Sequence, residues 1–496
     1  MFLNGYRWKY SIGCYLLTQP FKKLVHDART QIALFNGLVL ENTFNLISMY
    51  YHIITLGCQM NLSDSEKIIT VLNDIGLTRT DNEDEASILG IVACSVRQGA
   101  INKVYSRIHK WNKMKARKPV LTFVSGCILP SDKEKFLKLF DMVFPMSELA
   151  QLPELISQNG IVTPMGLSNQ QYSFNSENGI HQVWNVQPQY SSTFEAFVPI
   201  QNGCDKFCTF CAVPYTRGRE VSRDSNEIIA EVRTLVECGY KSITLLGQNV
   251  NSYGLDKKGS EISFPQLLRK IGELGCSHGD GFLTYFTSPH PRDMTKEVID
   301  VVANYTVLAK QIHLPLQSGD DKVLIHMNRN YKVAEYRNIV QYIRAKLPSS
   351  TIFTDIIVGF TGETDEQFQH TVEAFEEFQF NMAYIAQYSP RPGAVSSRWI
   401  DNISHDVKKQ RFHLLTKELE KHSAAYNKQQ VGKTMRVLVT GFDRKGVHLS
   451  GLTEGKINVR IASGNNKLIG TFVDVQMDAG TEFSLAGVYI PEKSAR

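Results

Sequence analysis

The sequence predicts an α/β protein made of an open α/β domain, a partial (β/α)6 barrel and a small C-terminal β-barrel. Three observations predict this fold class. Apolar runs alternate with helical patterns over most of the chain, six such units follow a polar segment, and short strands separated by glycines end the chain. The 496 residues suffice for about three domains. The expected boundaries are 49–165 for the first domain, 166–192 for a linker, 193–426 for the barrel and 427–491 for the last domain.

The first 48 residues do not fit this pattern. Aromatic and basic residues are mixed there, and no acidic residue precedes Asp27. A transit-like segment is one interpretation. The simpler one is a start site assigned too far upstream, because Met49 directly precedes the first patterned strand.

Composition excludes several classes of protein. Hydrophobic residues make up 43% and charged residues 21%, as in ordinary globular proteins. Charged residues interrupt every apolar stretch, so no membrane span is expected. The nine cysteines are too few for a disulfide scaffold, which favours a reducing cytoplasm. Residues 427–496 carry ten Lys or Arg against six Asp or Glu, and an anionic partner is expected at that end.

In the first domain, apolar runs at 53–57, 87–93 and 119–125 are separated by helices at 63–76 and about 102–118. Ser63 and Glu66 stand at capping-box spacing, which predicts the start of the first helix. Three cysteines directly follow the three runs: Cys58, Cys94 and Cys127. Because parallel strands end at one edge of a sheet, these thiols should converge.

The barrel is predicted from six apolar runs, at 194–200, 242–246, 281–286, 311–316, 352–358 and 381–387. Polar, Gly-rich and Pro-rich loops follow them, and active sites of such barrels lie at that end of the strands. Gln248 and Asn249 are expected to line a ligand pocket there, because their amides can both donate and accept hydrogen bonds; a capped polar turn is the alternative. His290 and His313 are either general bases or structural elements of the turns.

A helix at about 405–426 leads to five short strands, whose small barrel is of a kind that commonly binds nucleic acid. Arg217, Arg219 and Arg223 follow the first barrel loop. They are either anion contacts or solvated surface residues.

The sharpest motif is CxxxCxxC, formed by Cys204, Cys208 and Cys211 straight after the first barrel strand. Three thiolates at this spacing can bind three irons of a [4Fe-4S] cluster and leave the fourth iron open. Phe210 is expected to pack against the cluster or its ligand. Cys14, Cys238 and Cys276 have no partner at ligand spacing and are predicted to be inert.

This motif on a partial barrel resembles the radical S-adenosylmethionine superfamily. The resemblance implies that the open iron holds the amino and carboxylate groups of S-adenosylmethionine. Reductive cleavage of the sulfonium then yields a 5'-deoxyadenosyl radical, while the protein supplies ligation, orientation and exclusion of water.

Further motifs resemble the methylthiotransferase family over about 49–489. They are Gly-Cys-Gln-Met-Asn at 57–61, Ala-Cys-Ser-Val-Arg at 93–97, Ser-Gly-Cys at 125–127, and Val-Pro-Tyr-Thr-Arg-Gly-Arg-Glu at 213–220. The resemblance implies a second [4Fe-4S] cluster on Cys58, Cys94 and Cys127. It also implies that the C-terminal barrel is an OB-like, RNA-binding TRAM domain.

Gln59-Met60-Asn61 and Ser95-Val96-Arg97 resemble the branch that adds a methylthio group to C2 of N6-dimethylallyladenosine next to the tRNA anticodon. The implied cofactors are two [4Fe-4S] clusters and S-adenosylmethionine. The implied partners are the tRNA anticodon stem-loop, a donor of electrons such as flavodoxin or ferredoxin, and an unknown sulfur donor. Methylthiolation of a ribosomal-protein aspartate or of N6-threonylcarbamoyladenosine stays open, as does, remotely, a two-cluster electron carrier.

Overall fold

The computed structural model describes residues 49–95, 97–161, 179–279 and 281–491. The described residues all belong to a single compact unit. Segment 1–48 lies outside the described residues. The structure therefore does not test the two interpretations of this segment or the expectation for Cys14, which belongs to it. Among the described helices, none combines the length and the apolar character that crossing a membrane requires.

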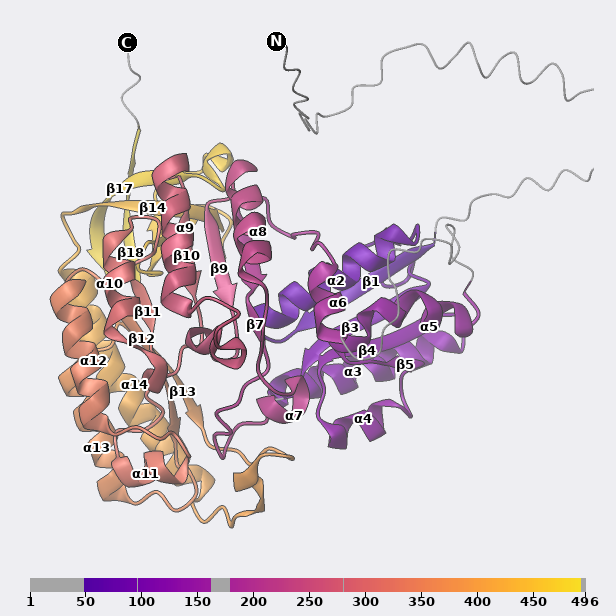
Figure 1. Ribbon diagram of the computed structural model, residues 1–496, viewed down its shortest axis with the longest axis horizontal. Coiled ribbons are helices and arrows are strands. Elements are labelled where there is room, and N and C mark those ends of the chain that lie inside the picture. The colour runs from indigo at the N-terminus through magenta and orange to yellow at the C-terminus, as the bar shows by residue number, and fades with distance from the viewer. Residues whose placement is uncertain (1–48, 96, 162–178, 280, 492–496) are drawn as a thin grey trace, which may run out of the picture. The chain divides into compact units, whose positions relative to one another are not determined.

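The first domain is an open sheet of five parallel strands in the order β2-β1-β3-β4-β5. Figure 1 labels β1, β3, β4 and β5 of this sheet. β3 and β4 are buried along their whole length, as expected of parallel strands with helices on both faces. The strands are β1 (Tyr50–Leu56), β2 (Thr78–Arg79), β3 (Ile88–Cys94), β4 (Leu121–Cys127) and β5 (Met142–Val143). The helices are α2 (Gln59–Asp74), α3 (Gln98–Lys115), α4 (Pro130–Phe136) and α5 (Leu152–Gln158).

Helix α2 begins four residues earlier than the sequence predicts. Its N-cap is Cys58, and the side chain of Asn61 at N3 accepts a hydrogen bond from the Cys58 amide at 3.2 Å. The predicted capping pair is therefore wrong, because Ser63 and Glu66 lie buried inside the helix. The Glu66 carboxylate instead accepts hydrogen bonds from the amide and hydroxyl of Ser191.

A short helix, α6 (Gly179–Asn185), lies in the segment expected to be a linker. Val183 and Val186 are buried in the core of the first domain, where they pack with Ile68 and Leu72 of α2. The surrounding polar residues hide this apolar spacing in the sequence.

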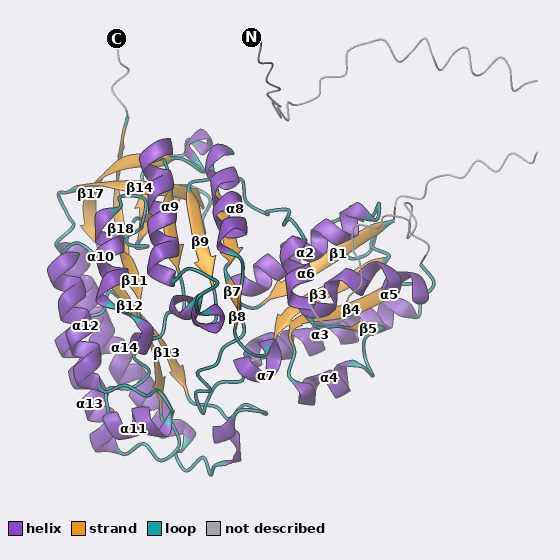
Figure 2. Ribbon diagram, viewed as in Figure 1, coloured by secondary structure: helices purple, strands orange, loops and turns teal. Residues whose placement is uncertain are grey.

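The central region has the six parallel strands that the sequence predicts (Figure 2). They form two three-stranded sheets, β10-β9-β6 and β11-β12-β13, with helices packed outside. The strands are β6 (Glu195–Pro199), β9 (Ser242–Leu246), β10 (Leu283–Phe286), β11 (Gln311–His313), β12 (Thr351–Val358) and β13 (Met382–Gln387). The helices are α7 (Val213–Arg217), α8 (Ser225–Glu237), α9 (Phe264–His278), α10 (Lys296–Asn304), α11 (Asp321–His326), α12 (Val333–Lys346) and α13 (Asp365–Phe378).

Helix α14 (His405–Lys428) leads to a closed barrel in the order β14-β15-β16-β18-β17. The predicted C-terminal barrel is thus confirmed. Its strands are β14 (Thr434–Phe442), β15 (Leu449–Thr453), β16 (Asn458–Ile461), β17 (Phe472–Gly480) and β18 (Ser484–Ile490). The β15–β16 turn docks on the central region, where the Lys310 amide donates to Glu454 Oε1 at 2.9 Å and Thr351 Oγ1 to the Gly455 carbonyl at 2.7 Å.

Candidate functional site

The CxxxCxxC loop leaves a small antiparallel hairpin formed by β7 (Gln201–Asn202) and β8 (Val221–Ser222). Gly203, directly before the first cysteine, has φ +80°, and a Cβ there would lie 2.0 Å from the Arg219 carbonyl oxygen. Both the left-handed backbone and the close approach require glycine. The hairpin therefore fixes where Cys204 starts the loop.

The connection after α11 anchors the other end of this loop. Thr209 donates from its amide to the Met327 carbonyl at 3.0 Å and from its hydroxyl to the His326 carbonyl at 2.9 Å. The buried guanidinium of Arg329 donates from Nη1 to Cys208 Sγ at 3.4 Å. One thiol of the motif is thus hydrogen-bonded to a buried cation.

The three thiols of this loop are free, and the chemistry of this donor set fits iron. Burial raises the pKa of Cys204 to about 11 and that of Cys211 to about 12, and iron deprotonates a thiol that it binds. Within the described ranges, no three His, Cys, Asp or Glu side chains converge on a point that one metal ion would occupy. A cubane binds each thiolate through a different iron, so its ligands need not converge in that way.

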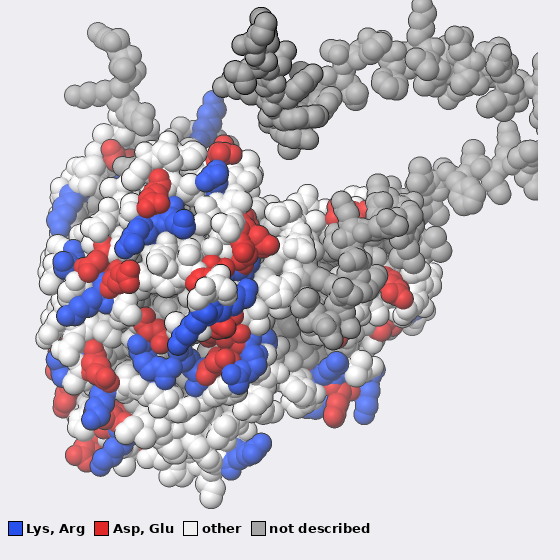
Figure 3. Space-filling view, in the orientation of Figure 1, with Lys and Arg blue, Asp and Glu red and all other residues white. Residues whose placement is uncertain are grey.

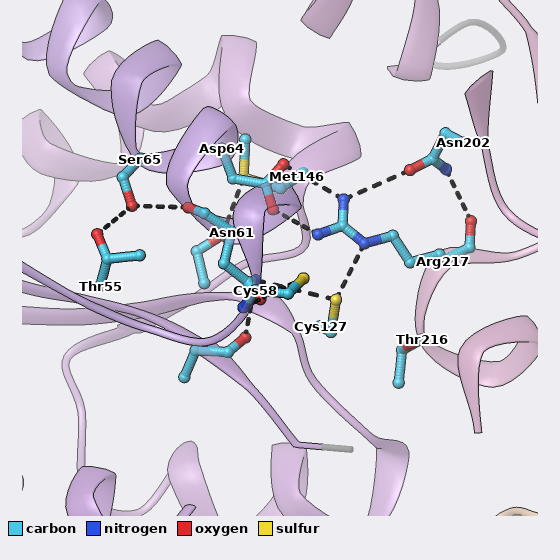
Figure 4. A network of polar contacts seen from close by, with 12 residues as sticks. Thr55, Cys58, Asn61, Asp64, Ser65, Cys127, Met146, Asn202, Thr216 and Arg217 are labelled. Carbon is cyan, nitrogen blue, oxygen red and sulfur yellow. Dashed lines mark hydrogen bonds and ion pairs between the residues drawn. The ribbon is translucent and has the colours of Figure 1, made fainter. Parts of the chain in front are cut away.

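The N-terminal cysteines come from three separate strands. Cys94 and Cys127 are paired in register at the ends of β3 and β4, and Cys58 follows β1. Asn61 lies between two of these thiols, with Oδ1 3.5 Å from Cys58 Sγ and Nδ2 3.9 Å from Cys127 Sγ (Figure 4). The structure brings together the three cysteines that the topology predicted to meet.

Arg217 connects this cysteine set to the central region (Figure 4). Its Nε donates to Cys127 Sγ at 3.0 Å, and its Nη1 and Nη2 bind both carboxylate oxygens of Asp64 in α2. Both side chains are more than nine-tenths buried. Burial opposes the charge of Arg217, but Asp64 and Cys127 outweigh it and raise its pKa.

The other two arginines near the loop differ from Arg217. Arg223 is buried and paired with Glu227 and Glu231, so it is not available to an RNA backbone. The Arg219 side chain is 74% exposed and bound to Asp205. The sequence does not reveal the partner of Arg217, because Asp64 lies 153 residues away along the chain.

A cavity of about 830 Å³ joins the first domain, the central region and the C-terminal barrel. All three N-terminal cysteines line it, together with Arg217 and Gln248. Its other walls are Gly57, Gln59, Met60, Arg97, Val213, Leu246, Gly247, Thr287, Ser288, Gln311, His313, Phe353, Asp355, Tyr384 and Lys456.

The two predicted pocket amides lie at the mouth of the barrel. Gln248 Oε1 accepts a hydrogen bond from the Gly203 amide, which connects it to the CxxxCxxC loop. Asn249 is buried and donates to Asp293 at 3.0 Å, but its Oδ1 has no hydrogen-bond partner among the described residues. Gln201 Oε1 and Thr244 Oγ1, which sequence reasoning missed, are also buried and have no partner in the same described ranges. Buried polar atoms normally have partners, so these atoms fit a polar ligand.

The two histidines that the sequence singled out, His290 and His313, lie in different surroundings. His290 is buried, its Nδ1 accepts from the Arg292 amide at 3.2 Å, and burial holds its pKa far below the usual range. It is therefore a neutral part of a turn. His313 instead lines the cavity, with Nε2 3.1 Å from Asp355 Oδ1.

Phe210 packs edge-on against Phe360, with ring centroids 6.5 Å apart, in a small apolar cluster. Cys238 and Cys276 are exposed. On the face seen in Figure 3, basic and acidic side chains are intermixed, with no broad area of one sign. The charge of that face does not mark it as a nucleic-acid interface.

Family models match all three parts of the chain. The Radical SAM superfamily matches residues 198–375, the family described as Uncharacterized protein family UPF0004 matches 50–145, and the TRAM domain matches 428–490. The chain is therefore a radical S-adenosylmethionine enzyme with a TRAM domain.

Curated relatives narrow the class. The chain is 38% identical over 462 residues to a tRNA-2-methylthio-N(6)-dimethylallyladenosine synthase of Staphylococcus haemolyticus, covering 92% of this chain and 86% of that protein. It is 38% identical over 459 residues to the protein of that name from Clostridium perfringens, covering 91% and 99%. The chain belongs to the family of tRNA-2-methylthio-N(6)-dimethylallyladenosine synthases, and it is a transferase.

Solved structures agree on the fold. A radical S-adenosylmethionine methyltransferase, TsrM, from Kitasatospora setae superposes with a TM-score of 0.52 over 71% of this chain and 75% of that chain, at 13% identity. The structure of TsrM with cobalamin and a [4Fe-4S] cluster gives a TM-score of 0.51 at 12% identity, covering 71% and 77%.

Proposed function

We propose that this protein adds a methylthio group to C2 of N6-dimethylallyladenosine next to the anticodon of tRNA. The observation that carries the proposal is the shared cavity. Three thiols at the edge of one domain open into the same space as the polar loops of the barrel. That space brings a sulfur site and a radical-generating domain to one substrate.

The two cysteine sets have separate roles. Cys204, Cys208 and Cys211 hold one [4Fe-4S] cluster, and Cys58, Cys94 and Cys127 hold a second. When bound, the first cluster supplies the electron that cleaves S-adenosylmethionine, and the second is the sulfur site. Phe210, Gln248 and Asn249 bind S-adenosylmethionine beside the first set, supported by the unpartnered Asn249 Oδ1.

The overall exchange breaks the C2–H bond and forms a C2–S bond. One S-adenosylmethionine takes up an electron and is cleaved to methionine and the radical that leaves with the C2 hydrogen as 5'-deoxyadenosine. A second gives its methyl group to a sulfur atom and leaves as S-adenosylhomocysteine. An external donor supplies that sulfur at the oxidation level of sulfide, and the electron is returned when the C2–S bond forms. Electrons come from a carrier such as flavodoxin or ferredoxin. We also propose a cytoplasmic location, because the six ligand thiols must stay reduced.

The chain's own residues hold the parts in place. Arg217 ties Cys127 to the element that follows the CxxxCxxC loop, and Asn61 lies between Cys58 and Cys127. We assign 49–165 to the sulfur-site domain, 193–426 to the radical domain and 427–491 to the TRAM domain. Of the expected linker 166–192, α6 packs into the core of the sulfur-site domain and is assigned to it. Anticodon-loop bases are unpaired, so one base can leave the stack and enter a cavity.

The test uses the reconstituted protein with a reductant, S-adenosylmethionine and an anticodon stem-loop that carries N6-dimethylallyladenosine. Mass spectrometry of the nucleosides should show the 2-methylthio product. A stem-loop with plain adenosine, one with N6-threonylcarbamoyladenosine and a ribosomal-protein aspartate substrate are the controls. Product on one of the last two, and none on the prenylated stem-loop, would overturn the proposal.

A further inference from the structure

Lys456 stands in the turn between β15 and β16 of the C-terminal barrel, where this turn docks on the central region. Its φ is +56°, in the left-handed region that side chains other than Gly and Asn rarely adopt. Its amide donates to the Thr453 carbonyl at 2.9 Å, which closes the turn. Strained residues of this kind cluster at ligand-binding positions.

The side chain of Lys456 reaches into the central region. Its Nζ lies 4.1 Å from the ring centroid of Tyr285 in β10, and Lys456 lines the 830 Å³ cavity that the N-terminal cysteines share. A residue of the third domain thus forms part of the wall of the cavity in which we place the chemistry.

The ammonium group of Lys456 contacts the aromatic ring of Tyr285 and is not paired with a carboxylate among the described residues. In the part of the chain that the structure describes, it forms no ion pair within 4.0 Å and donates no hydrogen bond. Glu195 is the carboxylate whose charge acts on Lys456, but the two form no ion pair within 4.0 Å. Two further carboxylates have other partners, since Asp355 binds His313 and Glu454 accepts from the Lys310 amide. Burial lowers the pKa of Lys456, and the negative charge of Glu195 opposes this shift without cancelling it.

We propose that Lys456 binds a backbone phosphate of the RNA at the nucleotide whose base enters the cavity. The C-terminal barrel is then part of the reaction cavity as well as an RNA-binding domain. This inference rests on the proposed function. It follows from charge, because the adenine and its dimethylallyl group are neutral and the phosphate is the anion that this substrate brings.

Two other kinds of anion take part in the reaction. The thiolates of Cys58, Cys94 and Cys127 line the same cavity, but they serve as iron ligands in the proposed function. The carboxylate of S-adenosylmethionine belongs beside Cys204, Cys208 and Cys211, none of which lines the cavity, although Gln248 of the proposed cofactor site does. The position of Lys456 therefore favours the RNA phosphate.

The experiment measures binding of prenylated anticodon stem-loops, each with one methylphosphonate near the target nucleotide, to the reconstituted full chain. A methylphosphonate removes the charge of one phosphate and keeps its size. For the natural protein, one position should weaken binding by about tenfold, the worth of a charge-assisted contact. Lys456→Met should weaken binding of the unmodified RNA by a similar factor. For this variant, the methylphosphonate at the sensitive position should cause no further loss of affinity.

Two variants complete the design. Lys456→Arg keeps the charge and should retain the sensitivity to that one methylphosphonate. Lys445→Met removes an exposed lysine of the same barrel, so it matches the change in net charge and should leave the sensitivity at that position intact. A plot of log affinity against log salt concentration should be less steep for Lys456→Met. The magnitude of its slope should fall by about 0.7, the contribution of one phosphate contact to unpaired RNA.

The proposal is overturned if Lys456→Met keeps the methylphosphonate pattern of the natural protein. It is also overturned if that variant raises the KM for S-adenosylmethionine and leaves RNA affinity unchanged. These outcomes leave the proposed function standing. If the natural protein does not bind the prenylated stem-loop at all, the proposed function fails and takes this inference with it.

Discussion

The two cysteine sets are built in opposite ways. Cys204, Cys208 and Cys211 lie on one loop, held by a hairpin at one end and by the residues after α11 at the other. The N-terminal set meets only because strands β1, β3 and β4 are parallel and end together. The first site depends on local geometry, and the second depends on the fold of a whole domain.

The sets share one feature. In each, a buried arginine donates to one thiol, Arg329 to Cys208 and Arg217 to Cys127. Their charges are balanced differently, because Arg217 is also paired with Asp64 while Arg329 donates to the Pro315 carbonyl. The comparison teaches that in the sheet site the arginine that donates to a thiol is itself part of a buried ion pair. In the loop site the ion pair is made by another residue, Lys206, whose Nζ lies 2.6 Å from Asp293 Oδ2, and not by Arg329.

The largest effect is expected from Cys204→Ala. It removes one of only three proposed ligands of the radical cluster, so formation of 5'-deoxyadenosine should stop. The N-terminal set should still bind iron, which leaves about half of the total. Cys238→Ala changes an exposed cysteine outside both sets and is the matched control, expected to keep full activity. Near-normal release of 5'-deoxyadenosine by Cys204→Ala would remove the basis of the comparison.

The converse variant replaces Cys58, Cys94 and Cys127 together by Ala. Iron should again fall by about half, but 5'-deoxyadenosine should still form because the loop set is untouched. No methylthiolated nucleoside should appear. Measuring iron, 5'-deoxyadenosine and nucleosides on one preparation tests these points together, and methylthiolated product from this variant would show that the N-terminal cysteines are structural.

The contrast between a site set by local geometry and a site set by a domain fold explains how each could be predicted from the sequence. The loop set is predicted by the spacing of its three cysteines along the chain, and the meeting of Cys58, Cys94 and Cys127 follows from predicting parallel strands. Strands β1, β3 and β4, the six strands of the central region and the closed C-terminal barrel were also predicted, because apolar runs, alternation and glycine punctuation are local signals. The two-residue strands β2, β5, β7 and β8 were not predicted, because they are too short to leave a pattern. The pairing of Arg217 with Asp64 was not predicted, because the two residues are 153 positions apart in the sequence. The cap of α2 was missed for another reason: Cys58 and Asn61 are only three residues apart, but cysteine is not a usual N-cap, and Ser63 with Glu66 offered the standard pattern.

Arg217→Met should destabilise the protein by about 3–5 kcal/mol, because it leaves Asp64 buried without its cation. Arg329→Met should cost less, since no carboxylate is left unpaired there. The double variant Asp64→Leu/Arg217→Met should regain much of the loss, as replacement of a whole buried pair often does. Urea unfolding of the four proteins without iron measures this, and equal losses for the two single arginine variants would mean that the ion pair does not distinguish the sites.

The smallest expected effect tests whether the loop site is held by its backbone. Gly203 and Gly239 have similar φ values, +80° and +86°, so replacement by Ala imposes a similar conformational cost of about 1 kcal/mol at each. Only Gly203 faces a clash, with a Cβ 2.0 Å from the Arg219 carbonyl, whereas nothing lies within 4 Å at Gly239. Gly203→Ala should therefore lose more stability and also lose iron from the radical site, because the hairpin must open beside Cys204. Urea unfolding and iron analysis of both variants separate the clash from the strain. If they behave alike, the hairpin yields to an added methyl group and the loop site is less rigidly built than the sheet site.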